Sequence, residues 1–163
     1  MVTKMCVAAA NYIIRKTNEF NETQEYTNRI SMTCKRLQKL LYFSDIEFMR
    51  KHSGTSMFRD EFYAWPSGPV IPSVYYKFMK YQNGYMNPLG GEHEDLTTDM
   101  ENAIDSILAQ TNKMDTLDLV EVAHDKSGPW AQVYNPSDPD HKQIISKTDI
   151  YNYYVDRNIF GAL

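Results

Sequence analysis

The chain of 163 residues has only two cysteines, Cys6 and Cys34, and they form no CxxC pair. Two isolated thiols exclude a multi-cysteine disulfide framework and fit a reducing compartment. No apolar run approaches the roughly 18 residues that a membrane-spanning helix needs. The apolar stretch near the start is interrupted by Asn11 and followed by Arg15 and Lys16, so it lacks the pattern of a signal peptide. We therefore expect a cytoplasmic protein without a membrane partner.

Basic residues are outnumbered by acidic ones, with 17 Lys and Arg against 21 Asp and Glu, giving a formal net charge of -4. Such a chain has no overall attraction for a phosphate backbone or an anionic membrane, so nucleic-acid binding would need a local basic patch. Aromatic residues, by contrast, make up 13% of the chain and include twelve tyrosines. Aromatic side chains fill cores and also anchor interfaces, so their abundance permits both roles.

Catalytic signatures are also missing, because the sequence has no GxSxG, P-loop or Rossmann glycine pattern. Both cysteines lie in apolar helical patterns without the electropositive surroundings of a reactive thiol. Polar loops carry the residues that resemble metal ligands, which are His93, Glu94 and Asp95 in one loop and Asp138, Asp140 and His141 in another. Neither loop has a second cluster at ligand spacing, so we favour solvated loops and expect no enzyme, metal or cofactor. A metal-dependent enzyme that uses His93 or His141 stays open as an alternative.

Apolar spacing and capping residues predict a mostly α-helical fold, one compact domain over residues 1–163. The predicted helices are residues 5–16, residues 31–51, one that begins at Pro72 and ends at Asn83-Gly84, and four that begin near Thr98, Asp115, Gly128 and Ser146. A polar connector is expected over residues 17–28, and a short extended segment over residues 57–65. Residues 31–51 carry two apolar stripes, which predicts a helix buried between layers at the centre of the fold.

Residues 62–80, FYAWPSGPVIPSVYYKFMK, combine three prolines with six aromatic residues. Pro66, Gly68 and Pro69 predict tight turns, because proline fixes φ and glycine adopts conformations that other residues avoid. Two readings of the aromatic residues stay open. Trp65, Tyr75 and Tyr76 either close the core or form a rigid, preorganised patch for a partner.

Basic residues cluster along the helix predicted at residues 31–51, where Lys35, Arg36, Lys39 and Arg50 are expected on one face. Such a face would contact phosphates in a DNA-associated phage or transcriptional regulatory protein, which we keep as an alternative function. Phe43 and Ile46 interleave with these cations and favour packing or a protein partner instead. Together with the acidic total, they make nucleic acid the less favoured partner.

Residues 36–79 resemble the core of the Panacea domain family, the phage-associated GepA-like or SocA-like proteins. The elements that carry the resemblance are residues 37–43 (LQKLLYF), Phe58, residues 64–65 (AW), residues 68–70 (GPV), Pro72, Tyr75, residues 128–130 (GPW) and the segment from Ile144 onward. These elements follow one another in order along nearly the whole chain, and their succession is more specific than any one of them.

The resemblance implies an intracellular, mostly α-helical protein of bacterial or prophage origin that acts as an antitoxin. Members neutralise unrelated toxin proteins by direct contact, and one branch delivers its toxin to a Clp-type protease. The implied partners are therefore a toxin, expected from an adjacent gene, and a Clp-type protease. The resemblance implies no catalytic residues in this chain. For an antitoxin that covers its toxin with an aromatic and apolar surface, we nominate Trp65, Val70, Tyr75 and Tyr76 as partner-binding residues, with Arg36 and Lys39 as charged contacts.

Overall fold

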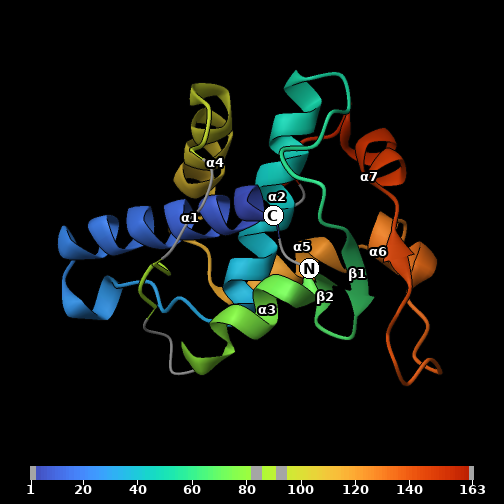
Figure 1. Cartoon of the computed structure of the whole chain (residues 1–163), viewed down its shortest axis with the longest axis horizontal. Helices are drawn as coiled ribbons and strands as arrows, with labels where there is room; N and C mark the ends of the chain where they lie inside the picture. The colour runs from blue at the N-terminus through green and yellow to red at the C-terminus, as the bar shows by residue number, and fades with distance from the viewer. Residues whose placement is uncertain (1–2, 82–85, 91–94, 162–163) are drawn as a thin grey trace.

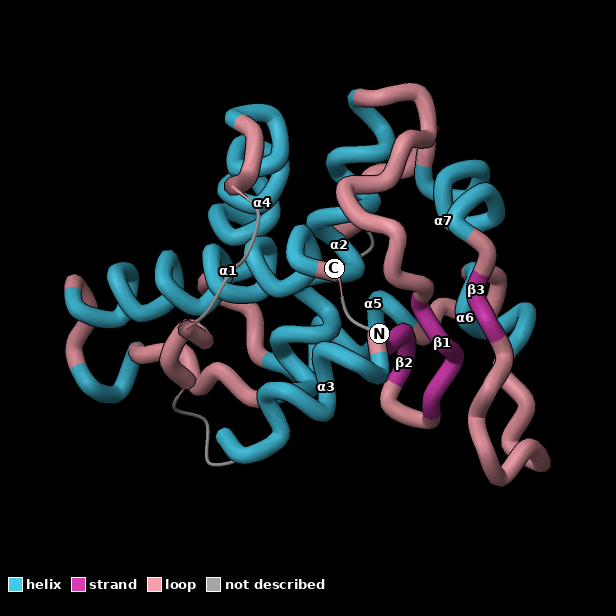
Figure 2. Tube along the Cα trace, in the orientation of Figure 1, coloured by secondary structure: helices cyan, strands magenta, loops and turns pink. Residues whose placement is uncertain are grey.

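The computed structural model of the chain describes residues 3–81, 86–90 and 95–161. Its described part is 56% helical with seven α-helices and a small three-stranded sheet, so the predicted mostly α fold is confirmed. Three strands lie together on one side of the molecule, whereas α1 (Lys4–Glu22) and α4 (Thr98–Thr111) lie on the other (Figure 2). The elements in chain order are α1 (Lys4–Glu22), η1 (Tyr26–Asn28), α2 (Cys34–Lys51), β1 (Phe62–Trp65), β2 (Gly68–Val70), α3 (Pro72–Phe78), η2 (Met79–Tyr81), α4 (Thr98–Thr111), α5 (Thr116–Ala123), α6 (Pro129–Val133), β3 (Ile144–Ile145) and α7 (Lys147–Tyr154).

Helix α2 is the centre of the fold, as the two apolar stripes predicted (Figure 1). It contacts α1, α3, α4, α5, α7 and β2, and every residue from 36 to 46 is buried. A helix covered on all sides also buries the polar side chains that its sequence carries, and each needs a hydrogen-bond partner to offset its desolvation. The partners of these polar side chains tie α2 to the elements around it.

Asp45 and Lys147 make one of these ties. Asp45 has no exposed surface, and its carboxylate accepts a hydrogen bond from Lys147 Nζ on α7 at 3.0 Å. The same carboxylate accepts hydrogen bonds from Ser56 Oγ and from the Met57 backbone N–H. Lys147 also lies over the Phe58 ring, with Nζ 4.6 Å from the centroid. The ion pair therefore fixes α7 and residues 56–58 against the central helix.

Local capping signals set most helix starts. Thr33 accepts a hydrogen bond from Arg36 N, so α2 begins at Cys34, three residues later than the predicted start. Asp115 forms a capping box with Asp118 at α5, and Ser146 caps α7, both at the predicted positions.

Two helix predictions were wrong in their bounds. The expected connector over residues 17–28 is in part helical, because α1 continues to Glu22 and only then gives way to η1. Helix α4 starts at Thr98 with Thr97 as its cap, so the expected capping by Thr98 does not form. The Asn83-Gly84 stop predicted for α3 lies outside the described residues, and the described helical segment is α3 followed by η2.

The last four residues of the predicted extended segment form β1, the central strand of the sheet, whose order is β2-β1-β3. β1 pairs antiparallel with β2 through a tight turn, with Tyr63 opposite Val70 and Trp65 opposite Gly68. β3 pairs antiparallel with the other edge of β1, and this strand was not predicted. Burial alternates along β1, so that Phe62 and Ala64 face the core and Tyr63 and Trp65 face outward.

Candidate functional site

The rings of Trp65, Tyr75 and Tyr76 form one cluster where the β1–β2 hairpin meets α3, here called the aromatic corner. Ring centroids are 5.2 Å apart for Trp65 and Tyr75, 6.2 Å for Trp65 and Tyr76, and 5.7 Å for Tyr75 and Tyr76, all edge to face. This arrangement is the favoured one for aromatic quadrupoles. Tyr76 is 61% exposed, while Trp65 and Tyr75 are half-buried. The corner is thus both packed and displayed to solvent.

Three buried side chains hold the backbone of the hairpin, and we call them the hairpin clamp. Trp130 Nε1 on α6 donates to Trp65 O at 2.8 Å, and Lys39 Nζ on α2 donates to Pro69 O at 3.1 Å. Gln38 Oε1 accepts from Ile71 N at 2.8 Å. Side chains from two helices therefore bond two carbonyls of the hairpin and the N–H of Ile71 just after it, and they fix the path of the backbone that carries Trp65.

Lys39 is fully buried, and among the described residues no carboxylate forms an ion pair with it. Burial lowers the pKa of Lys39 to about 7, because the charged amine loses hydration that the interior does not replace. His124, stacked on Trp130 with centroids 4.0 Å apart, lies next to it. Burial and then the nearby Lys39 lower the pKa of His124 as well. Its Nε2 atom is buried and has no hydrogen-bond partner among the described residues.

Gly68 makes room for this polar pair beneath the hairpin. Its φ is +110°, a conformation that side-chain-bearing residues rarely adopt. A Cβ at this position would lie 2.8 Å from Lys39 Cε and 3.3 Å from His124 Nε2. The absence of a side chain at Gly68 therefore lets the hairpin backbone lie close to Lys39 and His124.

Two hollows flank Trp65. The larger, about 710 Å³, lies over the outward face of β1 and is lined by Asp60, Glu61, Tyr63, Trp65, Ile71, Pro72, Ser73, Tyr76, Asp140, His141, Lys142 and Ile144. The smaller, about 270 Å³, is lined by Thr33, Cys34, Lys35, Gln38, Trp65, Ser67, Val70 and Tyr75. The aromatic corner is the ridge between them, and side chains of a partner have a recess on either side of it.

The nominated partner-binding residues fall into two groups. Trp65, Tyr75 and Tyr76 come together at the surface as the aromatic corner, and partner binding by them stays a prediction. Val70, Arg36 and Lys39 are buried, with exposed fractions of 1%, 3% and 0%. The expectation that Arg36 and Lys39 project as charged surface contacts was wrong, because α2 is covered on all sides and both side chains bond backbone carbonyls inside the fold.

The basic face predicted along α2 does not form. Only Lys35 of its four members is exposed without an ion pair in the described part of the chain, since Arg36 and Lys39 are buried. Arg50 lies 3.7 Å from the Glu47 carboxylate. The geometry therefore gives no support to a phosphate-contacting surface on this helix.

Within residues 3–81, 86–90 and 95–161, no three His, Cys, Asp or Glu side chains are placed to hold a metal ion. His93 and Glu94 lie outside the described residues. Asp138 accepts hydrogen bonds from the backbone N–H groups of Asp140 and Lys142, which lower its pKa and shape the loop.

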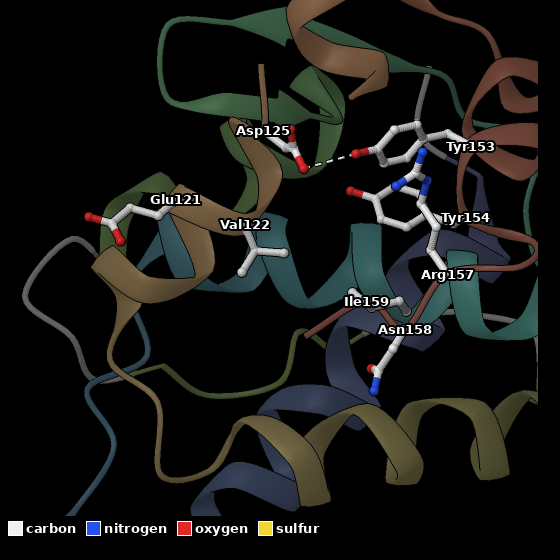
Figure 3. Close-up of a pocket in the computed structure, with 8 residues that line it drawn as sticks. All are labelled: Glu121, Val122, Asp125, Tyr153, Tyr154, Arg157, Asn158 and Ile159. Atoms are coloured by element: carbon white, nitrogen blue, oxygen red, sulfur yellow. Dashed lines mark hydrogen bonds between the residues drawn. The ribbon is translucent and has the colours of Figure 1, made fainter. Parts of the chain in front are cut away.

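A hollow of about 250 Å³ between α5 and the end of α7 had no signal in the sequence (Figure 3). Tyr153 donates from its hydroxyl to Asp125 at 2.9 Å, and the Arg157 guanidinium lies 4.2 Å from the centre of the Tyr153 ring. Hydrogen bonds from Ser127 and Tyr153 lower the pKa of Asp125 and keep it ionised. These groups bond one another across a fold contact, which favours a structural role for the hollow.

The fold and the corner define the class of protein, which is a mostly α-helical domain that presents a rigid aromatic ridge. Among the described residues, no helix is long and apolar enough to cross a bilayer. Residues 37–131 match the family described as "Antitoxin SocA-like, Panacea domain". The match covers more than half of the chain and includes α2 from Leu37 onward, the hairpin and the Trp130 motif. The chain belongs to this family.

A curated relative, Antitoxin SocA of Caulobacter vibrioides (strain NA1000 / CB15N), is 32% identical over 110 residues. The matched region covers 61% of this chain and 58% of the relative, so this chain spans less than two thirds of that protein's length. No solved structure matches the chain.

Proposed function

We propose that the chain is an antitoxin that neutralises a toxin protein by binding it at the aromatic corner, without catalysis. The observation that carries the proposal is the exposed Tyr76 on a ridge that is locked from beneath by the hairpin clamp. Aromatic anchors in a rigid frame dominate interface energies, because little side-chain entropy is lost on binding. Family membership supports the antitoxin role, since the curated relative is an antitoxin by name.

The proposal extends to the partner and the setting. The toxin is the product of an adjacent gene, and the two proteins meet in the cytoplasm. Neutralisation follows one of two routes, which are sequestration in a stable complex or delivery of the toxin to a Clp-type protease.

Co-expression with the product of the adjacent gene tests this proposal, with growth and co-purification of the two chains as readouts. We expect the wild-type chain to restore growth and Tyr76→Ala to restore it less. Tyr26→Ala is the matched control, because Tyr26 is 85% exposed and lies on η1, outside the aromatic corner. A harmless neighbour that never co-purifies overturns the pairing, and equal rescue by the two variants overturns the assignment to the corner.

The two routes separate in a host that lacks the Clp protease. Sequestration predicts rescue in both hosts and a stable complex. Delivery predicts rescue that is lost in the Clp-deficient host, together with a toxin that accumulates there.

A further inference from the structure

A third hollow, of about 650 Å³, lies away from the aromatic corner, where the end of α1, η1, the start of α2 and the α4–α5 connection meet. Its lining residues are Phe20, Gln24, Thr27, Asn28, Arg29, Ile30, Ser31, Arg36, Asn112, Lys113, Met114, Asp115 and Thr116. We call it the cationic hollow, because its charges differ in sign from those of the protein as a whole.

Arg29, Arg36 and Lys113 bring three positive charges to this hollow from three separate segments, in a chain whose net charge is -4. Asp115 is the single carboxylate in the lining, and it is engaged in the α5 capping box with Asp118. None of the three cations forms an ion pair with a carboxylate within the described part of the chain. The larger of the two hollows beside Trp65 carries charge of the opposite sign, because three carboxylates line it.

Arg36 is the buried member of the set, at 3% exposure. Its Nη1 and Nη2 atoms donate to Met114 O and Thr111 O, both at 2.9 Å, which fixes the guanidinium at the end of α4. Those carbonyls are neutral, and Arg36 Nε has no hydrogen-bond partner among the described residues. Burial lowers the pKa of Arg36 and the nearby Asp115 carboxylate opposes this shift, and a guanidinium stays charged in proteins. The hollow thus has a positive wall that lacks a bonded counter-ion.

Backbone groups add to this positive potential. Helix α5, which begins at Thr116, starts beside the hollow, and its Asp118 N–H already bonds the Asp115 carboxylate. The first residues of α2 line the smaller hollow beside Trp65 instead. The first turn of a helix presents unpaired N–H groups and the positive end of the macrodipole, which favour anions. Ser31, Asn112 and Thr116 line the same space and offer neutral hydrogen-bond donors.

A purely structural role explains part of this arrangement. Arg36 bonds the carbonyl of Thr111, the last residue of α4, and the carbonyl of Met114 in the connection that follows, and a cation at a helix C-terminus is favourable there. That role does not account for Lys113, which is exposed and lines the same space from the α4–α5 connection. Arg29, at the C-cap of η1, is also exposed. Its Nε donates to Gln24 O at 3.4 Å and its guanidinium lies 5.9 Å from the centre of the Tyr26 ring, and this local packing includes no carboxylate from the described residues. We propose that the cationic hollow binds a small molecule that carries more than one negative charge on phosphate or carboxylate groups. This site is independent of the antitoxin proposal and of the aromatic corner.

Arg29 and Lys113 provide the direct charged contacts in this proposal, because their side chains are exposed and able to close on a ligand. Arg36 supplies a fixed charge behind them, and its Nε provides one further donor. Multiple charge-assisted hydrogen bonds from separate segments make such a site selective for polyanions over chloride.

Titration of the whole protein with pyrophosphate and with citrate, followed by amide and arginine side-chain NMR, tests the site at constant ionic strength. We expect saturable shifts at Ser31, Lys113 and Thr116 and at Arg36 Nε. Pyrophosphate separates a phosphate ligand from the carboxylate ligand that citrate represents. The double variant Arg29→Ala with Lys113→Ala should weaken binding by about tenfold or more, because it removes both exposed cations.

The matched control is the double variant Arg59→Ala with Lys77→Ala, which removes two exposed cations that do not line the hollow. It should bind as the wild type does. Shifts that never saturate with either anion overturn the proposal, as does an equal loss of affinity in both double variants. Circular dichroism of each variant verifies that the fold is kept, and neither variant touches the buried Arg36.

Discussion

Lys39 Nζ donates a hydrogen bond to Pro69 O at 3.1 Å from a side chain with no exposed surface. This contact joins the central helix to the hairpin that carries Trp65, so the burial of one lysine and the placement of the aromatic corner are linked. Because the amine has no carboxylate partner in the described part of the chain, its protonation state should change the free energy of unfolding.

Stability should rise with pH between about 7 and 10 because of Lys39. Its pKa is about 7 in the folded chain, against 10.5 for an exposed lysine, so the unfolded chain holds the extra proton in this range. The free energy of unfolding therefore increases with pH by up to about 1.4 kcal/mol per unit, and the full cost of burying the charge is present below pH 7. Urea unfolding over this range measures the slope.

Lys39→Met should remove that contribution to the slope, because methionine does not titrate. Lys77→Met, at an exposed lysine on α3, is the control and should keep the wild-type slope. Equal slopes in wild type and Lys39→Met would show that Lys39 remains charged in the folded protein.

Gly68→Ala should destabilise the fold by about 2 kcal/mol, because it places a side chain at a φ of +110° and in contact with Lys39 Cε. Gly90→Ala is the matched control, since a Cβ at Gly90 meets no atom of the described residues within 4 Å apart from its chain neighbours. Chemical denaturation of both variants measures the difference. Similar stabilities would mean that the hairpin moves away from Lys39 at little cost.

Tyr76→Ala should weaken toxin binding by about 2 kcal/mol or more, as expected for an aromatic anchor at an interface. Its effect on the free energy of unfolding should stay within about 0.5 kcal/mol, because the side chain is largely exposed. Calorimetric titration with the purified toxin measures the first quantity and urea unfolding the second. A variant that unfolds readily but binds normally would assign Tyr76 to the core.

Lys147→Met should cost about 3 kcal/mol of stability, because it leaves the fully buried Asp45 carboxylate without its cation. The double variant Lys147→Met with Asp45→Asn should lose less stability than the sum of the two single losses, since Asp45→Asn removes the carboxylate charge that Lys147→Met leaves without a cation. Lys142→Met is the control, because its contact with Asp140 is 3.9 Å long and solvent-exposed, so we expect no measurable change. Additive costs for Asp45 and Lys147 would argue against a direct coupling.

Most helix starts and the turn beside Trp65 could be predicted from the chain alone, because both depend on local chemistry, although the bounds of α1, α2 and α4 differ from those expected. Capping at Asp115 and Ser146 follows from the bonds that a short side chain makes to the next turn of backbone, and the double apolar stripe of α2 marks a buried helix. The prolines and Gly68 likewise restrict their own backbone, so a rigid turn beside Trp65 could be predicted without knowing the fold.

Which polar residues lie inside depends on contacts between distant segments of the chain. The sequence predicted Arg36 and Lys39 to be surface cations, but both are buried. The carbonyls that they bond belong to distant segments, at Thr111, Met114 and Pro69. β3 was missed for the same reason, since a two-residue strand exists only through its pairing with β1. The cationic hollow combines residues 29, 36 and 113, which only the packing of α1, α2, α4 and α5 brings to one place. Long-range contacts of this kind depend on how helices pack, and spacing along a single sequence does not encode them.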